Sequence, residues 1–225
     1  MPDLSPTIDG RGLKLGSTWA NTTGDGVDAT SINTATKFWN GGINAIDVSA
    51  FGSTQVERYF VEFDTSEIEA EPQDATFKLF GKNADSADVI CVQASFASAG
   101  ALVVGDWDSW NESSPVDYTD EITSWDDGDY NEFTITAAGL AAMVSLDEFQ
   151  MICLEADNDY TQVSSNNAGL NLNAGLYTRL ATDAANRPVL NYTAADVDVA
   201  AVIFNGIELK GSNINIKGGS LKIGE

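Results

Sequence analysis

The stretch Glu57-Arg-Tyr-Phe-Val-Glu-Phe-Asp64 decides the fold class of this 225-residue chain. Tyr59, Val61 and Phe63 fall at every second position, which is the period of a strand with one face in a core. Phe60 falls between them on the opposite face. A large aromatic side chain there indicates that a second layer or a neighbour covers the outer face of this strand.

Working outward, strand patterns dominate the rest of the chain. Ala75 to Phe80 alternates in the same way, with Phe80 facing outward, and apolar runs separated by turn-forming Asn, Asp, Gly and Ser follow at Val89–Ala94, Phe133–Ile135, Phe149–Ala156 and Val189–Tyr192. One segment, Ala137–Leu146, has helical spacing. The pattern predicts an all-β fold: an antiparallel, jelly-roll-like β-sandwich with one short helix and a small C-terminal β appendage.

The charge and composition of the chain exclude several classes of function. The chain has 34 Asp and Glu against 11 Lys and Arg, and its formal net charge is -23. Nucleic-acid binding needs clustered cations, so we expect none. The chain also has no His, which removes the commonest general base and zinc ligand. These features predict a protein that is not an enzyme and has no catalytic residues.

Membrane and redox signals are sparse. No stretch approaches the roughly 18 consecutive apolar residues that span a bilayer, and the N-terminal residues lack a basic segment followed by an apolar run, so we expect neither membrane insertion nor a recognisable export signal. Cys91 and Cys153 each lie in an apolar run. Two inert thiols in the core are expected, with a single disulfide as the alternative.

The basic residues divide the chain into three parts. Lys and Arg are absent between Lys82 and Arg179, where most of the acidic excess lies, whereas both ends are close to neutral. We expect an N-terminal arm (1–25), a β-sandwich (26–193) and a C-terminal β tail (194–225) with short similar repeats. Apolar residues of the two ends are the candidates for docking on a partner: Leu13, Leu15, Ile203, Phe204, Ile207, Leu209, Ile214, Ile216, Leu221 and Ile223.

The order of several segments resembles a known family. Residues 57–64 are followed by Ala75-Thr-Phe-Lys-Leu-Phe80, an acidic stretch with Trp, Phe133-Thr-Ile-Thr136 before a short helix, and Asn186-Arg-Pro-Val-Leu-Asn-Tyr192. This order resembles DNRLRE-type domains, which are similar to jelly-roll carbohydrate-binding modules, over roughly Gly26 to Thr193. The resemblance implies a sandwich that recognises sugars.

Three loops carry candidate ligand-binding residues. Trp107 and Trp110, with Asp106 and Asp108, could stack on a sugar and bind its hydroxyls, although a solvated loop with one Trp tucked into the sandwich is the alternative. Catalysis by paired acids here is disfavoured, because acids at this density pair by chance. Calcium would suit the closely spaced carboxylates of two acidic loops, Asp126, Asp127 and Asp129 in one and Asp157 and Asp159 in the other, with plain solvated turns as the alternative.

Two functions are compatible with these patterns. The first is a structural accessory protein of a bacteriophage virion, such as a capsid decoration or cement protein, which docks on the major capsid protein through its near-neutral ends and forms a homo-oligomer, with a trimer favoured. The second is an extracellular carbohydrate-binding module that recognises glycans through the Trp-bearing loops.

Overall fold

The computed structural model describes residues 2–19, 23, 28–48, 53–85, 88–96, 100–164, 173–195, 202–204 and 207–209. For residues 39–42, 44–48, 53, 83–85, 173, 202–204 and 207–209 it describes the main chain alone. Two compact units divide the chain, Met1–Ala194 and Ala195–Glu225.

The first unit is an antiparallel β-sandwich made by one curled sheet, as the alternating pattern predicts. Its strands run in the order β1-β11-β6-β10-β4-β5-β2-β3, with β9 paired to β5, β7 to β9 and β8 to β6. The bounds are β1 Asp3–Leu4, β2 Ile8–Gly16, β3 Ser31–Asn33, β4 Lys37–Val48, β5 Ser53–Asp64, β6 Asp74–Asp85, β7 Val89–Gln93, β8 Tyr130–Thr134, β9 Glu148–Glu155, β10 Asn173–Tyr177 and β11 Val189–Thr193.

Short helical segments complete this unit. In the described residues they include the 3₁₀ turns η2 (Val104–Asp108) and η4 (Ala184–Asn186), the π turn η3 (Ala156–Tyr160) and the helix α2 (Ala137–Ser145). The predicted helix is confirmed and ends one residue earlier than expected. Thr136 begins it, because its hydroxyl accepts a hydrogen bond from the Gly139 N–H. Among the described residues, no helix is long and apolar enough to cross a membrane.

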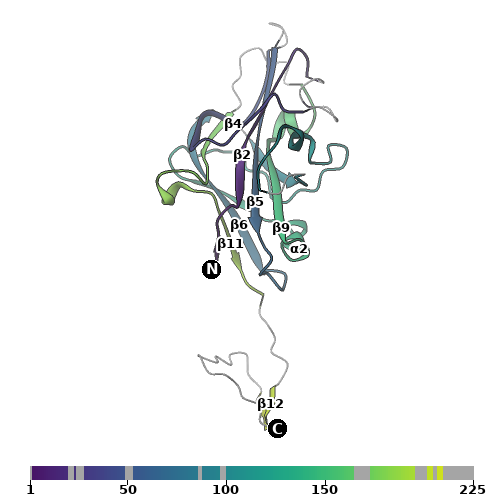
Figure 1. The fold of residues 1–225 in the computed structure, drawn as a ribbon, viewed down its shortest axis with the longest axis vertical. Helices are drawn as coiled ribbons and strands as arrows, with labels where there is room; N and C mark the ends of the chain where they lie inside the picture. The colour runs from purple at the N-terminus through teal and green to yellow at the C-terminus, as the bar shows by residue number, and fades with distance from the viewer. Residues whose placement is uncertain are drawn as a thin grey trace. The chain divides into compact units, whose positions relative to one another are not determined.

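Strand β5 is the centre of the sandwich. It pairs with β2 on one side and with β4 and then β9 on the other, and α2 lies beside β9 (Figure 1). Its inward residues Tyr59, Val61 and Phe63 enter the main core, where the ring of Phe63 packs edge-on against Phe77 of β6. The residues at every second position of β5 therefore face the main core, as the sequence pattern predicts.

The outer face of β5 is also buried. Val56 and Phe60 belong to a second apolar cluster with Trp107, Trp110 and Ile152. The described parts of the segment 94–116, residues 94–96 and 100–116 with η2, cover this face and supply those indole rings. The second layer that Phe60 predicts is thus confirmed. Phe80 instead packs edge-on against the half-buried rings of Tyr130 and Tyr177.

The N-terminal residues belong to this sandwich rather than to a separate arm. β1 pairs with β11, and β2 pairs with β5 from Ile8 to Gly16. Charge balance, on which the prediction of an arm rests, carries no information about strand pairing, and residues 8–16 pair with β5 along their whole length. In the second unit, β12 (Val202–Phe204) and β13 (Ile207–Leu209) form an antiparallel hairpin.

Candidate functional site

A buried arginine organises the outer face of β5. Arg58 is 0% exposed, and its Nε and Nη2 donate to Oδ2 and Oδ1 of Asp159 over 2.9 and 2.8 Å. Its Nη1 donates to the carbonyl oxygen of Trp107 over 2.9 Å. The fork of the guanidinium matches the carboxylate in two parallel hydrogen bonds, which is the strongest arrangement for this pair.

Two indoles cover the guanidinium. Its central carbon lies 4.2 Å from the ring centroid of Trp107 and 5.3 Å from that of Trp110, both within the range of a cation–π interaction. Trp110 in turn stacks on Tyr160, at 6.5 Å between centroids. Glu112 adds a second carboxylate, with Oε1 3.6 Å from Nη2 of Arg58. Ionic and aromatic contacts to Arg58 therefore cover the outer face of β5 together.

The close approach of Trp107 depends on a glycine in β2. A Cβ atom at Gly12 would lie 2.8 Å from Phe60 and 3.0 Å from the ring of Trp107, closer than side chains pack. Any larger residue would push the indole away from Arg58. Residue 12 is thus a glycine because of its neighbours rather than because of its own backbone angles.

Glu155, at the end of β9, holds Asp159 in place. Its carboxylate accepts hydrogen bonds from the main-chain N–H groups of Asp157, Asn158 and Asp159 and from the side chain of Asn158. It therefore caps the η3 turn that presents Asp159 to Arg58. Burial raises the pKa of the Glu155 carboxyl to about 7, because the charged form loses water, and these hydrogen bonds lower it only in part.

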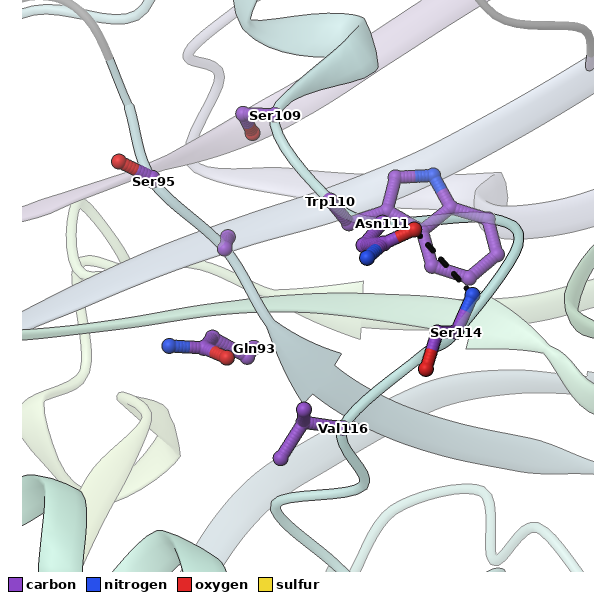
Figure 2. A pocket seen from close by; sticks show the side chains of 8 residues that line it. Gln93, Ser95, Ser109, Trp110, Asn111, Ser114 and Val116 are labelled. Carbon is purple, nitrogen blue, oxygen red and sulfur yellow. Dashed lines mark hydrogen bonds between the residues drawn. The ribbon is translucent and has the colours of Figure 1, made fainter.

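A hollow of about 210 Å³ opens beside this cluster. Figure 2 shows it between the end of β7 and the loop 109–116. Two main-chain hydrogen bonds hold the two segments together, Gln93 N to Val116 O and Ser95 N to Ser109 O.

The lining of this hollow is uncharged. Exposed side chains of Gln93, Ser95, Asn111 and Ser114 form its rim, and Trp110, which is 5% exposed, forms part of its wall. In a chain of net charge -23, such a lining is better suited to a neutral polar group than to an ion. Hydroxyl and amide groups of this kind bind hydroxyl-rich molecules by hydrogen bonds.

Another hollow, of about 220 Å³, lies near β4 and β10. Lys37 and Asp183 line it together with Tyr177, and the ammonium of Lys37 lies 5.8 Å from the centroid of the Tyr177 ring. The charged groups distinguish this hollow from the neutral one.

The predicted sugar platform is wrong in its geometry. Trp107 is 0% exposed and Trp110 nearly as buried, so neither ring offers an open face on which a sugar could stack. Their faces are used by Arg58 and Tyr160. Asp106 is buried too, and its Oδ2 accepts a hydrogen bond from the Val103 N–H, which closes the η2 turn. Asp108 is half-buried in the same turn.

The five predicted calcium ligands do not come together. Asp126, Asp127 and Asp129 are exposed on a turn whose Asp129 carbonyl accepts the Gly81 N–H, whereas both oxygens of Asp159 are engaged by Arg58. Asp157 is exposed. Within the described ranges, no three carboxylate or thiol side chains gather closely enough to hold a metal ion.

The predicted docking residues fall in different settings. Leu13 and Leu15 lie in β2, where Thr30 bonds to the Leu13 carbonyl and the Leu15 N–H, so their main chain is already used, although the Leu15 side chain is 50% exposed. A partner strand cannot add at Leu13, because β2 has neighbours on both sides at that residue, β3 and β5. The main chain of Ile203, Phe204, Ile207 and Leu209 lies in the β12–β13 hairpin. Ile214, Ile216, Leu221 and Ile223 lie outside the described residues.

Comparison with known proteins adds no family to these observations. No protein-family model matches the chain, and a search of curated proteins found no match.

Sequence reasoning did not identify the partner of Arg58. The sequence marks Arg58 as one of few cations in an acidic body, for which a carboxylate partner is expected. Asp159 is 101 residues away and is one of many acids. The sequence indicates the role of Glu155 only weakly: an acidic residue at the end of a strand, shortly before Asp157 and Asn158, is typical of a side chain that caps a turn.

Replacement of Asp159 by Asn tests the buried ion pair. Asp159→Asn leaves the Arg58 cation buried without its main counter-charge, so we expect the free energy of unfolding to fall by about 3–5 kcal/mol. Urea denaturation measures this. Asp157→Asn, two positions earlier and exposed, is the matched control and should change the value by about 0.5 kcal/mol or less. A loss below about 1 kcal/mol in Asp159→Asn would show that the pair does not hold this face.

The pKa of Glu155 predicts a pH dependence of stability. Below pH 4.5 the group is protonated in both states, and above about pH 7 it is ionised in both. Between these values the unfolded chain releases the proton while the folded chain keeps it, so the free energy of unfolding falls as pH rises, by about 3 kcal/mol in total.

Glu155→Gln removes this titration. Denaturation curves from pH 4.5 to 8 should show a smaller decrease in stability for Glu155→Gln than for the unchanged chain, whatever the absolute stability of the variant. Glu148→Gln, exposed on the same strand, is the control and should keep the full decrease. Parallel curves for all three proteins would disprove the assignment.

Proposed function

We propose that the protein is a structural accessory protein of a virus particle, most specifically a bacteriophage capsid decoration or cement protein. It docks on the major capsid protein through its C-terminal unit while the acidic sandwich faces solvent. The observation that carries this proposal is the division of the chain into a large sandwich and a small unit of its own, Ala195–Glu225.

The small unit is the docking element because it cannot form a core alone. It has 31 residues, below the roughly 40 residues under which a chain usually needs a partner, a metal or crosslinks to stay folded. Its described strands, Val202–Phe204 and Ile207–Leu209, are nevertheless almost entirely apolar. Contact with a capsid subunit, or with the same unit of two further copies in a trimer, would bury these residues.

Features of the sandwich support a docking role for the C-terminal unit. The buried ion pair of Arg58 with Asp159 is satisfied inside the sandwich and holds the covering segments on β5. The acidic residues of the segment between Lys82 and Arg179 are mainly exposed, which favours a solvated outer surface and weak attraction for nucleic acid. The localisation that follows is the virion.

Cosedimentation tests the docking role. The full chain and the 1–194 sandwich are each mixed with shells assembled from the candidate major capsid protein and pelleted. We expect the full chain to pellet with the shells and the sandwich to stay in solution, with equal melting temperatures of the sandwich in both proteins. Ile207→Asp in the full chain should weaken binding at least tenfold. Equal binding of the truncated chain, or no binding by either, would overturn the proposal.

A second candidate function, glycan binding, is favoured by the neutral hollow at Gln93, Ser95, Asn111 and Ser114. Its size is that of about one sugar ring, and its rim presents hydroxyl and amide groups without charge. In this proposal the sugar contacts lie beside the Trp-bearing loop, and Trp107 and Trp110, whose rings are buried, are not the stacking platform. An extracellular carbohydrate-binding role, or a virion protein that also binds host glycans, would use this hollow.

A glycan array with the full chain tests this second function. Binding of a neutral oligosaccharide should fall at least tenfold in Gln93→Ala and in Ser95→Ala. Thr182→Ala, in the charged hollow, is the control and should bind normally. The absence of binding to any neutral glycan, or equal loss in the control variant, would exclude the hollow as a sugar site.

A further inference from the structure

The two cysteines of the chain lie opposite each other in neighbouring strands. Cys91 of β7 pairs with Cys153 of β9, and their sulfur atoms are 2.8 Å apart, closer than two unbonded thiols usually rest. Both side chains are 0% exposed and lie in the main core. They are separated by 62 positions in the sequence, and the structure holds both as free thiols.

The main chain shows which kind of cross-strand pair this is. The Cys91 N–H donates to Oγ1 of Thr119, and the Cys91 carbonyl accepts from the N–H groups of Tyr118 and Thr119. Both polar groups of Cys91 therefore point away from β9. In an antiparallel ladder this defines a non-hydrogen-bonded pair, whose Cα atoms approach to about 4.5 Å.

That separation lies within the range that a disulfide bridges, about 4.4–6.8 Å between Cα atoms. The side chains also point to the same side of the sheet, because opposed residues in a ladder share a face. No movement of the backbone is needed to join them.

We propose that Cys91 and Cys153 form an intramolecular disulfide that staples β7 to β9 when the protein folds in the presence of a small disulfide such as glutathione disulfide. This modification is independent of the docking and glycan-binding proposals. It closes a loop that contains η2, Trp107, Trp110 and Glu112, so it fixes the β7 end of the segment that covers Arg58.

The reaction is an exchange that balances. The thiolate of one cysteine attacks a sulfur of the small disulfide, which releases one small thiol and leaves a mixed disulfide. The thiolate of the second cysteine then attacks the protein sulfur of that mixed disulfide and releases the second small thiol. Two electrons pass to the reagent, which is reduced, and the two protons of the cysteines end on its two thiols.

The burial of the two thiols determines when the disulfide can form. Desolvation, together with the neighbouring Cys91, raises the pKa of the Cys153 thiol well above its usual value, so the folded chain holds very little reactive thiolate. Exchange therefore takes place before β7 settles against β9, or during its transient opening. Once formed, the bond is shielded from reductants by the same burial.

The test is to refold the full chain with and without glutathione disulfide and to alkylate it in denaturant. The mass should show no added alkyl group after oxidative refolding and two after prior reduction, with a monomer on a non-reducing gel. The folded oxidised chain should resist reductant unless denaturant is present. Its melting temperature should exceed that of the reduced chain by about 10 °C, since the closed loop is long.

Cys91→Ala/Cys153→Ala is the control, and its melting temperature should not respond to oxidant or reductant. The comparison of oxidised with reduced unchanged chain does not depend on this variant folding. Two alkylated cysteines after oxidative refolding, a covalent dimer, or an oxidised form that melts no higher than the reduced form would each overturn the proposal.

Discussion

The outer half of this sandwich depends on one buried cation. Arg58 lies on the face of β5 that points away from the main core, where an ordinary sandwich strand would meet water. Asp159 neutralises it through two hydrogen bonds, and the Trp107 carbonyl takes a third. Because an unpaired charge in this position would cost several kcal/mol, the segments that carry Asp159 and Trp107 are held against β5.

This constraint links features that are far apart in sequence. Glu155 caps the turn that aims Asp159, Gly12 of β2 leaves room for Trp107, and Trp110 stacks between Arg58 and Tyr160. The cysteine pair lies on the face of β7 and β9 that points into the main core. Cys91 is three residues before the start of the segment that covers Arg58. The neutral hollow opens where this segment leaves β7. A ligand bound there would contact residues whose positions are set by the Arg58 cluster.

The chain combines this closed body with a C-terminal unit that has little material for a core of its own. A strongly acidic sandwich is soluble and repels copies of itself, whereas a short apolar hairpin favours association. The combination is the basis of the proposed attachment to a larger assembly. A neutral hollow on an acidic surface would add recognition of an uncharged ligand without changing this arrangement.

The sequence by itself determined the all-β class and the positions of β5, β6, β7, β8, β9, β11 and the helix α2, because the spacing of apolar residues is a local property of the chain. It also indicated that Phe60 needs a covering layer and that Arg58 needs a carboxylate. Only the tertiary structure decided that Asp159 is that carboxylate, that Trp107 and Trp110 are buried rather than open to a sugar, that residues 8–16 join the sheet and that Cys91 faces Cys153. These outcomes depend on strand register and on contacts between residues far apart in the sequence. A chain with 34 acidic residues offers many possible partners for one arginine, and only the packing of the folded chain selects among them.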